Sequence, residues 1–206
     1  YRVTCAVTVP TGNTLTIDPG VDVLFDADVQ FIVQGALDAV GTETDSIRFM
    51  KGLASEWGGL RISGGDSSTF VYVRVSDGVS ILGGGLFVSE SGTEVVLEHS
   101  CISQNQAVED TVQYLPGYGG GVAVADAATF VARGCTFQGN GGASPWGSAI
   151  HNRGGSIVSV IQSLFARNSI SWGLVHVDNA SFDRCTFASN DTVSSWKTPL
   201  LPVTNT

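Results

Sequence analysis

Apolar residues alternate with polar ones in short runs along almost the whole chain, and two-residue interruptions separate the runs. The clearest segments span 97–105, 132–140, 160–168 and 182–190, and each ends in asparagine. An apolar residue stands three positions before each asparagine, and a small residue stands five positions before it. The apolar residues are Ile102, Phe137, Phe165 and Phe187, and the small ones are Ser100, Cys135, Ser163 and Cys185. Alternation with a period of two predicts strands, and the interruptions predict corners at which Asn or Gly takes a left-handed backbone.

A second, glycine-bearing strand precedes each of these segments, starting at residues 58, 84, 120 and 147. These starts are 26, 36 and 27 residues apart, and the asparagines (with Gly78 as the first member) are 27, 35, 28 and 22 residues apart. Both series indicate one coil of 22–28 residues that repeats, with an insertion at 106–118. A unit of this length cannot bury its apolar face alone and must stack on copies of itself.

This period predicts an all-β chain that forms a single parallel β-helix over residues 1–206. Coils stacked about 4.8 Å apart would number about seven to eight. We expect 106–118 to be a projecting loop and 191–206 to be a C-terminal cap or a linker. A β-sandwich is the alternative; it would explain the alternation but not the repeating asparagine.

Several segments carry a family resemblance that covers nearly the whole chain. The stretches VTVPTGNTLTIDPGVDVLF, ALDAVGTETDSIRF, WGGLRI, CTFQGN, SLFARN and CTFASN resemble the right-handed parallel β-helix repeat proteins of secreted and surface-attached bacterial chains, within the pectate-lyase-like superfamily. The resemblance implies a right-handed solenoid. That superfamily includes polysaccharide lyases and hydrolases, adhesins and phage tailspikes, so the fold does not determine the function.

Composition and charge narrow the class of protein. The 26 glycines and two lysines argue against a helical bundle, and 43% hydrophobic with 14% charged residues argues against a disordered chain. A net charge of −9 argues against nucleic-acid partners, which require a basic surface. Because no apolar run reaches the roughly 18–20 residues of a membrane span, we expect no direct membrane insertion. We expect an extracellular or bacterial cell-surface location, with no signal peptide at the start of this sequence.

The repeat places Val71, Glu98, Arg133, Ile161 and Asp183 in one outward column of side chains. The next column holds Tyr72, His99, Gly134, Gln162 and Arg184. Glu98 and Asp183 would lie about 14 Å apart, too far for the paired carboxylates of a glycosidase, and Glu98 would instead pair with Arg133. We therefore name no catalytic residue and lean away from an enzyme. Two exposed carboxylates within about 9 Å in a groove would reverse that view.

Metal-binding patterns are weak in this chain. His151 and His176 stand near the start of successive coils, but no Cys, Asp or Glu accompanies both at a metal-ligand spacing, so we interpret them as surface histidines. We expect no cofactor and no metal site. Calcium is the one ion considered, at the closely spaced carboxylates of Asp18, Asp22, Asp26 and Asp28.

The four cysteines bear more on the fold than on the function. Cys135 and Cys185 share an inward column with one coil between them, so their Cα atoms would be nearly 10 Å apart, beyond disulfide reach. Cys101 is shifted by one position and should point outward, and Cys5 is several coils away. We expect no disulfide, although a secreted chain with four unpaired thiols is unusual.

Aromatic residues and the insertion supply the candidate binding residues. Trp57, Tyr118, Trp146 and Trp172 each immediately precede a glycine that opens a coil. Stacked in register, they would line one edge of the rod, either exposed to bind sugar rings or buried as corner packing, which the resemblance favours. The insertion adds Glu109, Asp110 and Tyr114 on a loop held by a rigid scaffold.

These patterns, together with the family resemblance, predict a non-catalytic extracellular or cell-surface structural or binding module, adhesin-like or glycan-binding. Its partners would be polysaccharide or other surface proteins. End-to-end self-association through open strand edges is a further expectation. The alternative function is a polysaccharide lyase or glycoside hydrolase of the parallel β-helix type.

Overall fold

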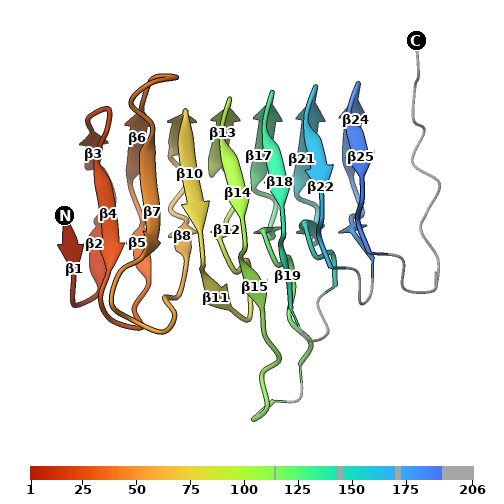
Figure 1. The fold of residues 1–206 in the computed structure, drawn as a ribbon, viewed down its shortest axis with the longest axis horizontal. Helices are drawn as coiled ribbons and strands as arrows, with labels where there is room; N and C mark the ends of the chain where they lie inside the picture. Colours follow the sequence, from red (N-terminus) through yellow and green to blue (C-terminus); the bar gives the residue numbers. More distant parts are fainter. Residues whose placement is uncertain (114, 143–145, 170–172, 192–206) are drawn as a thin grey trace.

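The computed structural model describes residues 1–113, 115–142, 146–169 and 173–191. The described residues form 25 strands and no helix, so none of their segments is a helix able to cross a membrane. The strands wind into a right-handed parallel β-helix (Figure 1). The predicted fold class is confirmed, and the largest sheet, with eight strands, matches the predicted number of coils.

Three sheets run the length of the rod, and we call them A, B and C. Sheet A consists of β1 (Arg2–Val3), β4 (Asp22–Phe25), β7 (Ile47–Lys51), β10 (Val73–Ser76), β14 (Cys101–Ser103), β18 (Thr136–Gln138), β22 (Leu164–Ala166) and β25 (Thr186–Ala188). Sheet B consists of β2 (Val7–Val9), β5 (Phe31–Val33), β8 (Leu60–Ile62), β12 (Leu86–Val88), β16 (Val122–Val124), β20 (Ile150–Asn152) and β23 (Val175–His176).

Sheet C consists of β3 (Thr14–Ile17), β6 (Ala36–Val40), β9 (Ser67–Val71), β13 (Glu94–Glu98), β17 (Thr129–Arg133), β21 (Ile157–Ile161) and β24 (Ala180–Asp183). A small sheet D lies between A and B along the chain and consists of β11 (Val79–Ser80), β15 (Gln106–Ala107) and β19 (Gly141–Gly142). Every pair of neighbouring strands is parallel, so each coil contributes one strand to each of the long sheets in turn.

The core is a set of side-chain stacks that run along the rod axis. Phe137 lies flat on Phe165 with ring centroids 4.7 Å apart, and Phe165 lies on Phe187 at 4.8 Å. Phe137 and Phe165 are fully buried, and Phe187 is 43% exposed. The stacking of equivalent residues from coil to coil, which the repeat predicts, is therefore confirmed, and the alternation of apolar and polar residues in each strand follows from burial of one face.

The corner after sheet A is built by asparagines. Asn105, Asn140 and Asn168 are fully buried and aligned with Asn190. Their backbone is not left-handed, contrary to expectation. The left-handed residue stands one position earlier in each coil, with φ between 52° and 64° at the non-glycine members, and this column holds Asp77, Gln104, Gly139, Arg167 and Ser189. The asparagine side chain instead bonds the buried backbone groups of the corner.

A second left-handed column separates sheets C and A. It holds Tyr72, His99, Gly134, Gln162 and Arg184, with φ between 49° and 60°. The small residue that follows closes the corner with its side chain: the Ser100 hydroxyl accepts the Val73 N–H at 2.9 Å, and the Ser163 hydroxyl accepts the Cys135 N–H at 3.0 Å. The outward columns read from the sequence are thus in register in the structure.

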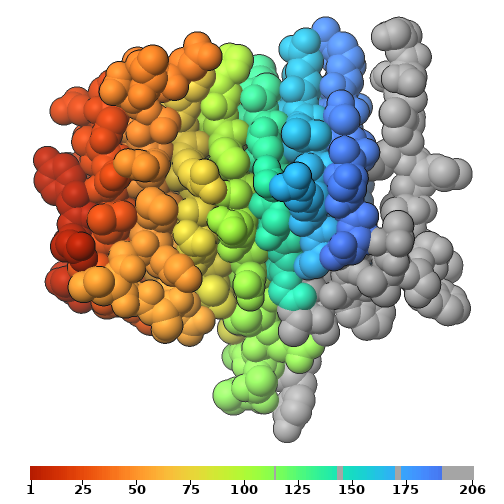
Figure 2. Space-filling model, in the orientation of Figure 1, coloured from red at the N-terminus to blue at the C-terminus, as the bar shows by residue number. Residues whose placement is uncertain are grey.

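The insertion starts within sheet D, because Gln106–Ala107 forms β15. The segment that follows extends away from the stacked coils, as Figures 1 and 2 show. Of the expected C-terminal cap or linker at 191–206, the structure describes Asp191, whose N–H donates to the Asn168 carbonyl at 3.1 Å. The rest of that segment lies outside the described residues.

Candidate functional site

Tyr118 and Trp146 form an aromatic pair at the start of the coils that contain β16 and β20. They are in register with each other, and Leu82 is in register with Tyr118 one coil earlier. Their ring centroids are 6.1 Å apart with an edge-to-face angle of 66°, and Trp146 is 37% exposed. This part of the predicted aromatic edge exists, whereas Trp172 lies outside the described residues.

Trp57, named as a candidate binding residue, does not belong to this edge: of its two interpretations, buried corner packing holds and an exposed sugar-binding surface does not. It is fully buried, stacks on Phe25 with centroids 4.1 Å apart, and donates its indole N–H to the Ser76 carbonyl at 2.9 Å. Trp57 is in register with Gly78, at the corner that the asparagines occupy in later coils. In this coil the indole fills that corner and bonds a backbone carbonyl, as the asparagine amides do.

Two histidines lie beneath the aromatic pair on the outer face of sheet B. His151 and His176 are in register and stacked, with ring centroids 5.1 Å apart. Tyr118 packs against His151 at 4.9 Å, and Trp146 packs against His176 at 4.9 Å. The prediction of a surface histidine was wrong for His151, which is 3% exposed because these aromatic side chains cover it.

The His151 ring has an uncommon environment. Neither of its ring nitrogens has a hydrogen-bond partner among the described residues. Burial, followed by the nearby His176 and Arg153, lowers the pKa of His151 to about 3, since each disfavours the charged imidazolium. The Arg153 guanidinium lies over the Tyr118 ring, 4.9 Å from its centroid. The aromatic pair is therefore supported from below by two imidazole rings and flanked by one cation.

The projecting loop supplies polar and apolar groups beside this edge. Glu109 is exposed. The Asp110 carboxylate accepts the N–H groups of Val112 and Gln113, both at 2.9 Å, so it holds the turn of the loop. Val112 is 85% exposed and Leu115 is 43% exposed. Tyr114, the remaining candidate in the loop, lies outside the described residues.

The acidic column identified in the sequence is present but has no catalytic arrangement. Arg133 bonds Glu98 at 3.2 Å, as predicted, and Asp183 pairs instead with Arg184 at 3.0 Å. The strand pairing places Arg133 and Ile161 between Glu98 and Asp183. The two carboxylates therefore do not share a site.

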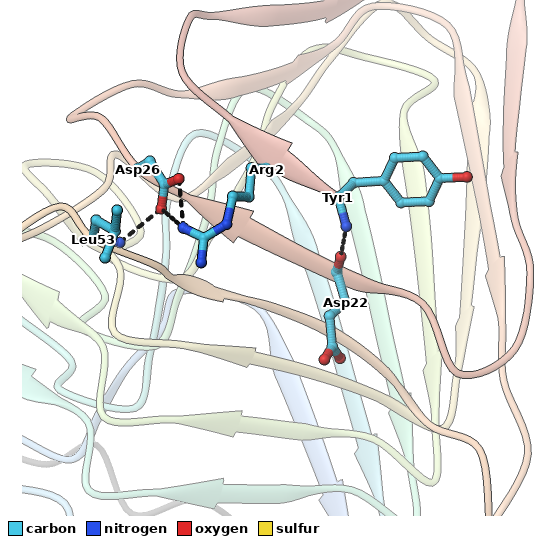
Figure 3. A network of polar contacts seen from close by, with 5 residues as sticks. All are labelled: Tyr1, Arg2, Asp22, Asp26 and Leu53. Carbon is cyan, nitrogen blue, oxygen red and sulfur yellow. Dashed lines mark hydrogen bonds and ion pairs between the residues drawn. The ribbon is translucent and has the colours of Figure 1, made fainter.

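Two of the four aspartates considered for calcium are engaged by arginines. Asp22 pairs with Arg48, and Asp26 accepts both Arg2 at 2.7 Å and the Leu53 N–H at 2.7 Å (Figure 3). The Arg2 bond, followed by the Leu53 N–H, lowers the pKa of Asp26. Within the described ranges, no group of three or more His, Cys, Asp or Glu side chains is placed to hold a metal ion.

The cysteines occupy the columns that the repeat predicts. Cys135 is 2% exposed, and burial raises the pKa of its thiol to about 11. Cys185 is half-buried, and burial also raises its pKa. Cys5 is exposed and Cys101 lies on the outer face of sheet A. All four thiols are free, and none takes part in the aromatic edge.

Two grooves on the outer surface of the described residues were not predicted from the sequence. The first, which we call the acidic groove, is lined by Asp28, Val29, Gln30, Glu56, Gly58, Val79, Ser80, Ile81 and Val108. Asp28 and Glu56 are exposed and lie on neighbouring coils, which are joined by the Gly58 N–H donating to the Val29 carbonyl at 2.9 Å. Aligning the segments that follow β4 and β7 would have revealed this pair.

The second, which we call the basic groove, lies on the outer side of sheet A and contains Arg74 and Arg167.

Searches of protein-family models, of curated proteins and of solved structures each found no match for this chain. The functional interpretation therefore depends on the geometry of these surfaces.

Proposed function

We propose that this protein is a non-catalytic binding module of an extracellular or bacterial cell-surface protein, and that it binds carbohydrate at the aromatic edge. The observation that carries the proposal is Trp146, an exposed indole held on a rigid coil beside a projecting loop. Its ligand-facing neighbours are Tyr118 and the loop residues Glu109 and Asp110. The partner would be a polysaccharide or the glycan of another surface protein.

Trp146 has the properties that sugar binding requires. An indole offers a large apolar face with few rotatable bonds, and the contacts with Tyr118 and His176 fix its orientation before a ligand arrives. Such preorganisation reduces the entropy lost on binding. Glu109, exposed on the adjoining loop, adds an acceptor for sugar hydroxyls.

A glycan array probed with the purified protein tests this function. We expect at least one glycan to bind, and we expect Trp146→Ala to weaken binding at least tenfold. Leu53→Ala is the matched control, because Leu53 is a large apolar residue that is 80% exposed elsewhere on the rod. Absence of any glycan binding, or equal losses in both variants, would contradict the proposal.

A polysaccharide lyase or hydrolase is the second candidate, and the acidic groove is the observation that favours it. Asp28 and Glu56 are exposed on neighbouring coils of one groove, and paired glycosidase carboxylates lie about 5–9.5 Å apart. Incubation with acidic and neutral polysaccharides, followed by chromatography of the products, tests this reaction. Depolymerisation that is abolished by Asp28→Asn and by Glu56→Gln would replace the binding module with an enzyme.

A further inference from the structure

The basic groove crosses four successive coils on the outer side of sheet A. Its lining residues come from strands β10, β14 and β18 of sheet A, and from the corners that follow β14, β18 and β22. They are Arg74, Cys101, Ser103, Gln104, Gln138, Gly139 and Arg167. Arg74 belongs to the first of these coils and Arg167 to the last. Three steps of strand spacing, about 14 Å, separate these coils.

The charge of this groove contrasts with that of the whole chain. The protein carries a net charge of −9, yet none of the groove-lining residues is acidic. The other described arginines have partners: Arg2, Arg48, Arg133 and Arg184 pair with carboxylates, and Arg61 and Arg153 lie over aromatic rings. Within the part of the chain that the structure describes, Arg74 and Arg167 have neither kind of partner. Two uncompensated guanidinium groups therefore lie along one groove.

The middle of the groove offers further hydrogen-bond donors. Ser103 is 3% exposed, and its hydroxyl is buried without a hydrogen-bond partner among the described residues. A buried, unsatisfied hydroxyl is destabilising, and a ligand that accepts a hydrogen bond from it would remove that penalty. Gln104 and Gln138 line the same stretch with amide groups. Gly139 presents no side chain between Gln104 and Arg167, which keeps the middle of the groove open.

We propose that the basic groove binds an extended polar ligand that carries sulfate or phosphate groups. Guanidinium groups pair with such oxyanions through two parallel N–H bonds, and the several oxygens of a tetrahedral oxyanion accept donors from more than one direction. The separation of Arg74 and Arg167 requires anionic groups at two points along the ligand. The groove lies on sheet A, away from the aromatic edge on sheet B, so the proposal is independent of glycan binding by Trp146.

Isothermal titration calorimetry at low salt tests this site with two probes, sulfated maltotetraose and a long-chain inorganic polyphosphate, and with unsulfated maltotetraose as the neutral control. We expect binding of at least one charged probe, and a loss of roughly tenfold or more in each of Arg74→Gln and Arg167→Gln. Arg133→Gln is the matched control, since it removes the same charge from an exposed arginine outside the groove. Asp77 stands in the same column as Gln104, one coil earlier. Asp77→Asn removes this negative charge beside the groove and should strengthen binding of the anionic probes.

Cys101 provides a second measurement at the same place. In a Cys5→Ser, Cys185→Ser background, a bound probe should slow the labelling of Cys101 by a thiol reagent, because this side chain lines the groove. Tighter binding of the sulfated sugar would identify a sulfated glycan as the ligand, and tighter binding of polyphosphate would identify a phosphate chain. The proposal is overturned if neither charged probe binds, if Arg133→Gln weakens binding as much as the groove variants, or if Cys101 is not protected.

Discussion

Asn140 donates its side-chain amide to the side-chain oxygen of Asn168 across 3.1 Å, and both residues are fully buried. The same amide donates to the Ile102 carbonyl at 2.9 Å, and the Asn140 side-chain oxygen accepts the Asn105 N–H at 3.2 Å. Each asparagine thus satisfies backbone groups of the preceding coil and binds the asparagine of the next coil. The corner after sheet A is held by this continuous hydrogen-bonded ladder.

Replacing Asn140 with alanine should lower the free energy of unfolding by about 2–4 kcal/mol. The loss follows because the Asn105 N–H and the Ile102 carbonyl would remain buried without partners, at about 1–3 kcal/mol each. Urea denaturation followed by circular dichroism measures the change. Gln138→Ala, a half-buried outward residue two positions earlier, is the control and should change stability by less than about 0.5 kcal/mol. Equal effects of the two variants would show that the asparagine ladder does not stabilise the fold.

Phe165 should be among the most sensitive residues of the core. Its ring lies between those of Phe137 and Phe187 and is fully buried, so Phe165→Ala leaves a cavity and should destabilise the fold by about 3–5 kcal/mol. Phe187→Ala makes the same chemical change at a ring that is 43% exposed and should have a smaller effect. Thermal and urea unfolding of the two variants give the comparison, and similar losses in both would contradict the stacked core.

The sequence allowed the interior columns to be predicted because inward residues recur with a fixed spacing. Phe137, Phe165 and the asparagines were aligned correctly for this reason. The same spacing misplaced Trp57, because the segment before it has a different length from the segments that precede Tyr118 and Trp146. A tryptophan followed by glycine therefore marks an interior corner at Trp57 and an exposed edge at Trp146.

Outward positions were harder to predict, because their burial depends on side chains that reach over from the next corner. His151 stands on the outer face of sheet B, where a repeat-based alignment predicts exposure, and it is buried by Tyr118 from a preceding segment. The two grooves were missed for a related reason. Their residues, such as Glu56 and Arg167, come from corners of different coils, which become neighbours only when the segments between the strands are aligned as well.

His151 should make the protein less stable as the pH falls from 6.5 toward 3. Its pKa is about 3 in the folded chain against 6.5 for an unperturbed histidine, so the unfolded chain binds a proton over this range and the folded chain does not. Linkage then lowers the free energy of unfolding with falling pH. The loss is as much as about 2 kcal/mol between pH 6.5 and pH 5, at about 1.4 kcal/mol per unit of pH.

His151→Phe isolates this contribution, because it keeps an aromatic ring under Tyr118 and removes the titrating group. Urea midpoints measured between pH 5 and pH 7.5 should fall more steeply for the natural chain than for the variant. Above pH 7 the urea midpoints of the natural protein and of the variant should change with pH at the same rate, since residue 151 then carries little charge in either protein. Parallel curves across the whole range would show that His151 is accessible to protons in the folded state.

The reactivity of the cysteines should follow their burial. Cys5 is exposed and should react first with a colorimetric thiol reagent in the native protein, followed by the partly exposed Cys101 and Cys185. Cys135 should react last, because burial hides its sulfur and raises its pKa to about 11, which leaves very little thiolate near neutral pH. Its labelling should instead follow unfolding and speed up with added urea. A Cys135→Ser variant identifies the slow phase of labelling. If the slow phase disappears in this variant, Cys135 is buried as the structure shows, whereas loss of a fast phase would place this thiol on the surface.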